Sequence, residues 1–152
     1  MSITSEPMGF PVQRIHPPDP RQLPHRPSTP AGSVRSLLRQ AQVALSDAHY
    51  EHRPADRYVY AHTAALRAAA ALLALRGKPG RRTKPTSVWV LLAKVAPELA
   101  EWADLFAAGS ARRHAAQTGV NRAVPQRDAD DLLRQSEQFL GIIERSISGD
   151  ER

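Results

Sequence analysis

The sequence predicts an all-α protein, and three observations support this prediction. Residues 54–76 consist largely of Ala and Leu, which have the highest helix propensities. Four further segments place apolar residues at three- and four-residue steps, and no segment alternates as a strand does. We therefore expect an up-and-down four-helix bundle with an additional short helix.

The first two helices are expected at 33–49 and 54–76. Ser33 is a suitable N-cap for the first, and Pro54 occupies the first turn of the second. Gly77 follows the last periodic residue, so we expect it to be a left-handed C-cap. The alanines of the second helix predict close contact with its neighbours.

Three more helices are expected after residue 86. A short helix covers 87–96, a longer one runs from Pro97 as a first-turn proline to about 117, and a last one covers 125–148. Gly119 is expected to close the longer helix, which Gly109 interrupts or bends. The aromatic residues on their apolar faces are expected in the core: Trp89, Trp102 and Phe106.

The first thirty residues differ in composition from the rest. They hold eight of the 13 prolines and few apolar residues. Such a segment lacks backbone donors and buries too little apolar surface to offset the entropy of ordering. We expect a disordered Pro-rich tail at 1–30 and a helical domain at 31–149.

Composition also limits the function. The absence of Cys excludes thiol catalysis, Cys-ligated zinc and disulfides. We find no secretory signal and no run approaching membrane-spanning length, so we expect a cytoplasmic protein without membrane association. The formal net charge of +6 favours an anionic partner such as nucleic acid or a nucleotide, although a GC-rich genome produces the same Arg and Ala bias without selection for binding.

The second helix carries a recognisable pattern. It contains Tyr58, Tyr60, Ala61, His62, Ala64, Ala65, Arg67, Ala69, Leu72 and Leu73, followed by Gly77. This pattern resembles the signature helix of the HEPN superfamily of small helical bundles. The order of the later segments agrees, so the resemblance covers residues 33–147, and it is closest to a branch of small stand-alone proteins in high-GC bacteria.

The resemblance implies a bundle that often dimerises, in a superfamily with several functions. Some members are metal-independent ribonucleases, and others bind nucleotides or accompany a nucleotidyltransferase. The ribonucleases carry an Arg, four to six residues and then a His, a spacing that Arg57 and His62 satisfy. In those enzymes the motif lies late in the bundle and a polar residue usually follows the Arg, whereas here it opens the second helix and Tyr58 follows.

We therefore expect a non-catalytic, HEPN-like homodimer that binds a nucleotide, RNA or a protein partner such as a nucleotidyltransferase or an antitoxin. Two alternatives stay open. One is a toxin-like, metal-independent endoribonuclease in which His62 transfers protons and Arg57 stabilises the phosphorane. The other is a purely structural interaction module, in which Arg57 lies at a helix end and His62 borders the core.

Two basic groups are candidates for binding phosphate or nucleic acid. One lies in the Gly- and Pro-rich loop: Lys78, Arg81, Arg82 and Lys84. The other surrounds the turn before the last helix: Arg112, Arg113 and His114, with Arg122 and Arg127. The alternative explanations, which need no ligand, are a solvated loop for the first group and cations favoured by a helix dipole for the second.

No metal or cofactor is expected. Asp128, Asp130 and Asp131 cluster at the start of the last helix, where the dipole favours acidic residues without a metal. No pair of His residues stands near them at ligand spacing.

The tail assignment gives a testable prediction. A protein that begins near Ala31 should keep its helical circular dichroism and melt within a few degrees of the full chain, because the tail has no periodic apolar face. A large fall in melting temperature would instead show that Phe10, Val12 or Ile15 packs on the bundle.

Overall fold

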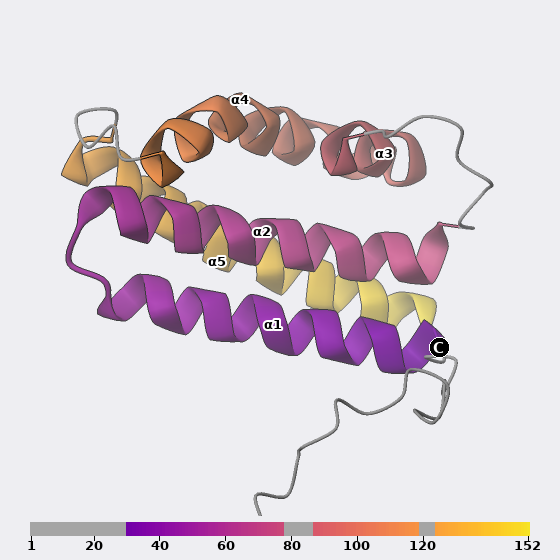
Figure 1. The fold of residues 1–152 in the computed structure, drawn as a ribbon. Coiled ribbons are helices and arrows are strands. Elements are labelled where there is room, and N and C mark those ends of the chain that lie inside the picture. Colours follow the sequence, from indigo (N-terminus) through magenta and orange to yellow (C-terminus); the bar gives the residue numbers. More distant parts are fainter. Residues whose placement is uncertain (1–29, 78–86, 119–123) are drawn as a thin grey trace, which may run out of the picture.

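The computed structural model describes residues 30–77, 87–118 and 124–152, and all of its regular elements in these ranges are helical (Figure 1). The elements are α1 (Pro30–Tyr50), α2 (Pro54–Arg76), α3 (Val88–Val95), the short 3₁₀ helix η1 (Pro97–Leu99), α4 (Ala100–Gln117) and α5 (Gln126–Asp150). The all-α prediction is confirmed.

Helix α2 is the central element of the bundle. It packs against α1, α3, α4 and α5, and in Figure 1 α1 lies on one side of it while α3 and α4 lie on the other. The long helices α1, α2, α4 and α5 alternate in direction, and α3 continues the line of α4 (Figure 1). This is the expected up-and-down bundle with one short additional helix.

Small side chains on α2 make this central position possible. Ala61, Ala65, Ala68 and Ala69 are completely buried. Because a methyl group separates two helix axes less than a Leu side chain does, neighbouring helices approach α2 closely. The alanine-rich sequence thus explains both the helix propensity and the packing.

Larger side chains fill the space between α3, α4 and α5. Trp89 and Phe106 stack with ring centroids 5.1 Å apart, and Phe139 lies 5.0 Å from Phe106. Trp102 stacks on Phe106 at 6.2 Å and is partly buried. The expected core positions of Trp89, Trp102 and Phe106 are confirmed.

The two ends of α2 are tied to the rest of the bundle by arginines. At its end, Arg76 donates hydrogen bonds of 2.6 Å to Glu98 of η1 and to Asp150 of α5. At its start, Arg57 makes the corresponding contacts with α1 and α5, which are described with the candidate site below.

Several boundaries differ from those expected. Helix α1 begins at Pro30, so Ser33 lies inside the first turns instead of capping them. Pro97 begins η1, and α4 starts only at Ala100. The helix continues through Gly109 without a break. Proline suits the first turn because it lacks the N–H that would otherwise be unpaired there.

The prediction of a left-handed cap at Gly77 was wrong. Its backbone is extended, with φ −81° and ψ 124°, and its N–H donates to the Leu73 carbonyl at 2.6 Å. A Cβ atom at this position would lie 2.6 Å from the same carbonyl oxygen. Glycine is therefore favoured here by a close approach of backbone atoms and not by a positive φ.

Helix α2 also corrects the expectation that no run approaches membrane-spanning length. Among the described residues it is long and apolar enough to cross a membrane by length and composition. Half of the 18-residue segment of α2 that is apolar enough is buried inside the bundle, as expected for the core helix of a folded domain. Residues 1–29 of the predicted tail and the predicted closing residue Gly119 lie outside the described residues, whereas Pro30, the last residue of the predicted tail, begins α1.

Gly109 provides a test of the packing between α2 and α4. A Cβ atom at this position would lie 2.7 Å from the Tyr58 hydroxyl, and Tyr58 is only 5% exposed. We expect Gly109→Ala to lower the free energy of unfolding by about 1–3 kcal/mol, because a buried ring has to shift. Urea denaturation of the purified variant measures this change.

Gly141→Ala is the matched control, since its added Cβ would lie 3.6 Å from the nearest atom, in ordinary contact. Replacing a glycine inside a helix without a clash stabilises it by roughly 0.5–1 kcal/mol. The double variant Gly109→Ala with Tyr58→Phe should recover part of the loss. Equal stability of Gly109→Ala and Gly141→Ala would contradict the packing described here.

Candidate functional site

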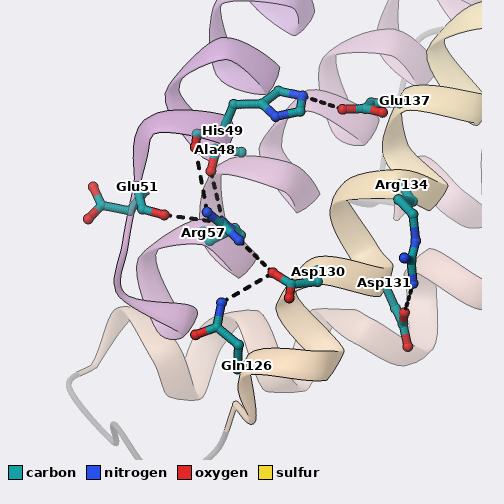
Figure 2. A network of polar contacts seen from close by, with 9 residues as sticks. All are labelled: Ala48, His49, Glu51, Arg57, Gln126, Asp130, Asp131, Arg134 and Glu137. Carbon is teal, nitrogen blue, oxygen red and sulfur yellow. Dashed lines mark hydrogen bonds and ion pairs between the residues drawn. The ribbon is translucent and has the colours of Figure 1, made fainter.

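Arg57 is placed at the first turn of α2, beside the end of α1. Its Nε donates hydrogen bonds of 3.1 Å to the carbonyl oxygens of Ala48 and Glu51, and Nη2 lies 3.5 Å from that of His49 (Figure 2). The last carbonyls of a helix lack intrahelical partners and carry partial negative charge. The guanidinium therefore caps the C-terminal end of α1.

The same guanidinium also contacts α5. Its Nη1 donates to Asp130 Oδ1 at 2.5 Å, and Gln126 donates to that oxygen at 3.3 Å (Figure 2). The Arg57 side chain is 18% exposed. Arg57 thus joins the end of α1, the start of α2 and the start of α5, which is a structural role.

His62 lies in the core on the next part of α2. It is 1% exposed, and its Nε2 lies 2.9 Å from the Phe106 carbonyl oxygen of α4. Trp89 and Phe106 meet its ring edge-on, at centroid distances of 5.8 and 6.2 Å. Since a carbonyl only accepts, the neutral ring donates its proton from Nε2.

The protonation state of His62 follows from these surroundings. Burial lowers its pKa from the ordinary value of 6.5, the hydrogen bond to Phe106 opposes this shift, and the positive charge of Arg113 adds to it. Its Nδ1 is buried and has no hydrogen-bond partner among the described residues. His62 is therefore neutral at physiological pH and closed to solvent.

Arg57 and His62 contact different elements of the bundle. Arg57 faces α1 and α5, whereas His62 faces α3 and α4. A five-residue step turns the helix by about 500°, which leaves the two side chains roughly 140° apart. The described contacts do not bring them to one cleft, and catalysis by this pair stays a prediction.

The basic group at the end of α4 is divided among different faces. Arg112 forms an ion pair with Asp128 of α5, whereas Arg113 turns toward α2 and donates to Thr63 Oγ1 at 3.2 Å. His114 is exposed. Consecutive helical residues point about 100° apart, so three in a row cannot share one face. Arg127 is exposed, and Arg122 lies outside the described residues.

The net positive charge of the chain does not come from the described helices. The described ranges contain 13 Lys and Arg residues and 13 Asp and Glu residues, and are therefore formally neutral. The whole net charge of +6 belongs to residues 1–29, 78–86 and 119–123. Four of these charges are the candidate phosphate ligands Lys78, Arg81, Arg82 and Lys84, which lie outside the described residues.

A groove lies between α4 and α5. It has a volume of about 340 Å³, and Tyr58 of α2 lines it together with Leu105, Gly109, Arg112, Asp128 and Asp131. Burial raises the pKa of the Tyr58 hydroxyl. Because Arg112 pairs with Asp128 across the groove, its charges largely cancel. Sequence reasoning missed this groove, since it depends on the separation of two helices.

The acidic residues at the start of α5 are paired with arginines. Asp128 pairs with Arg112, Asp130 with Arg57 and Asp131 with Arg134 (the last two in Figure 2). Within 30–77, 87–118 and 124–152, no three His, Asp or Glu side chains converge in a group suited to a metal ion.

The comparison with known proteins assigns the family. The family described as SAV_6107-like HEPN matches residues 48–144, which include α2, α3, α4 and most of α5. The chain belongs to this HEPN family. No curated protein and no solved structure matches the chain. The family match therefore confirms the resemblance of the second helix to the HEPN signature.

The buried His62 gives a prediction on pH. Its pKa in the unfolded chain is 6.5 and its pKa in the folded HEPN bundle is lower, so the unfolded chain takes up a proton first as the pH falls. The stability contributed by neutral His62 is complete above pH 6.5 and is lost as the pH falls toward the folded pKa. Within this window the free energy of unfolding should fall as the pH falls, with a slope from His62 of at most about 1.4 kcal/mol per pH unit.

Urea denaturation at pH 7.5 and 5.5 measures this slope. The variant His62→Leu should lack the part of the slope that His62 contributes. His52→Gln, at an exposed position, is the control and should keep the wild-type slope. Titration of the ring by NMR tests the cause directly. An imidazole of His62 that titrates at or above pH 6.5 would contradict the buried, neutral state.

Proposed function

We propose that this HEPN protein is a non-catalytic binding protein and that its ligand carries phosphate groups, as a nucleotide or RNA does. One observation carries the proposal: both residues of the Arg57 and His62 pair are occupied by contacts that hold the bundle together. A general acid–base must reach the proton that it transfers. His62 is enclosed by aromatic rings and lacks this access.

The distribution of charge supports a phosphate-bearing ligand. The helical body is neutral, whereas residues 78–86 carry four positive charges and no negative ones. Clustered Lys and Arg side chains bind phosphate by releasing its counterions, which makes the affinity strongly dependent on salt. Residues 78–86 connect the end of α2 to the start of α3.

The proposal is tested by titrating the purified protein with labelled RNA and with ATP at low and moderate salt. Wild-type protein should bind at least one of them saturably, with an affinity that falls as salt rises. Replacing Lys78, Arg81, Arg82 and Lys84 by Ala should weaken binding by roughly tenfold or more.

A matched control removes four positive charges from the described residues instead: Arg35, Arg39, Arg145 and Arg152, all exposed, are replaced by Ala. This variant has the same net charge as the first and should bind nearly as well as wild type. Equal weakening in both variants would show that only net charge matters.

Three further outcomes would redirect the proposal. If neither RNA nor ATP binds at low salt, the phosphate-bearing ligand is rejected and a protein partner is left, including a second copy of the chain, a nucleotidyltransferase or an antitoxin. RNA fragments that appear with wild type and disappear with a folded His62→Ala variant would establish the endoribonuclease. Co-purification with an obligate partner would favour the structural module.

A further inference from the structure

Arg113 of α4 contacts α2 on the face of that helix that carries Thr63 and Arg67. Thr63 and Arg67 are one helical turn apart on α2 and therefore share a face. Arg113 comes from α4 and donates from Nη2 to Thr63 Oγ1 at 3.2 Å. Arg67 is also close enough for its charge to act on Arg113. We refer to Thr63, Arg67 and Arg113 as the two-arginine cluster.

The positive charge of this cluster has no counterion among the described residues. Arg57, Arg76, Arg112 and Arg134 each form an ion pair with a carboxylate, but neither Arg67 nor Arg113 does so within the described ranges. Burial lowers the pKa of Arg113, and the charge of Arg67 lowers it further. Two cations are thus held near each other without compensation, which costs stability.

The hydrogen-bonding groups of the cluster are also incompletely used. The Nε of Arg113 is buried and has no partner among the described residues. A guanidinium has five N–H donors, and the hydrogen bond to Thr63 uses one of them. The Thr63 hydroxyl accepts that bond, which leaves its own proton available for donation.

We propose that the two-arginine cluster binds one phosphate group, through the guanidinium groups of Arg67 and Arg113 and the hydroxyl of Thr63. A phosphate anion at this place relieves the repulsion between the two arginines. It also accepts hydrogen bonds from the guanidinium N–H groups and from the Thr63 hydroxyl. Charge-assisted hydrogen bonds from arginine to phosphate are among the strongest in proteins, and their planar geometry suits two phosphate oxygens.

The inference rests on the proposed function in its choice of phosphate, and it adds a specific site in the helical body. This site differs from the groove between α4 and α5. Arg112, which precedes Arg113 in sequence, is turned toward Asp128 on that side and does not belong to the cluster. The phosphate of a nucleotide and that of RNA share this chemistry, and the experiment separates them.

Isothermal titration calorimetry with inorganic phosphate tests the cluster in the full chain. Wild-type protein should bind phosphate at one site per chain, and its melting temperature should rise when phosphate is added. Arg67→Gln should weaken this binding by about tenfold or more. Arg145→Gln removes an exposed arginine from α5 and should leave the affinity unchanged. Arg67 is exposed, so its replacement does not disturb the core.

A second measurement is made without any anionic ligand. Arg67→Gln should melt slightly above wild type in phosphate-free buffer because it removes the repulsion on Arg113, and Arg145→Gln should not.

ATP and a short RNA are then added separately to the phosphate-bound protein. The probe that displaces inorganic phosphate identifies the source of the phosphate group.

Equal phosphate affinity of Arg67→Gln and wild type, or no phosphate binding by wild type, would overturn the site. The proposed function would still stand if RNA or ATP bound through residues 78–86. Conversely, phosphate binding that requires Arg67 in a protein that binds neither RNA nor ATP would support the site and reject the proposed function.

Discussion

The close approach of neighbouring helices to α2 is the constraint on which the rest of the structure depends. Four helices pack on this one element, and its buried alanines permit them to do so. Gly109 of α4 extends the same principle across the contact, because its missing side chain leaves room for the Tyr58 hydroxyl. Interiors are packed densely enough that added methyl groups at such contacts are costly.

Polar groups in this bundle are used mainly to secure it. His62 binds a carbonyl oxygen of α4, Ser136 of α5 donates to the Ala61 carbonyl at 2.8 Å, and Arg57 binds carbonyl oxygens at the end of α1. Each contact joins α2 to a different helix. The residue types expected for metal-free RNA cleavage are present as Arg57 and His62, and the hydrogen bonds described for both residues join elements of the bundle.

Much of the fold was predictable from the sequence because helical periodicity is a local signal. The bounds of α2 agree with the Ala- and Leu-rich run. The eight residues that recur at helical spacing within 125–148 are all buried in α5: Ala129, Leu132, Leu133, Ser136, Phe139, Leu140, Ile143 and Ile147. The capping at Gly77 was not predictable, since a glycine accommodates a positive φ and a close carbonyl equally well. The two-arginine cluster escaped for another reason: Arg67 and Arg113 are 46 positions apart, and only the packing of α2 on α4 relates them.

The contact between Arg57 and the end of α1 has a consequence for how this sequence tolerates change. Arg57 recognises the main-chain carbonyls of Ala48, His49 and Glu51 and none of their side chains. Every residue type carries such a carbonyl, so the contacts of Arg57 with α1 do not depend on the residue types at positions 48, 49 and 51, whereas they do depend on the arginine. Lysine does not replace it, because a single ammonium cannot reach α1 and Asp130 with the same planar fork. The connection between the first two helices thus depends on the identity of one residue and on the backbone geometry of its partners.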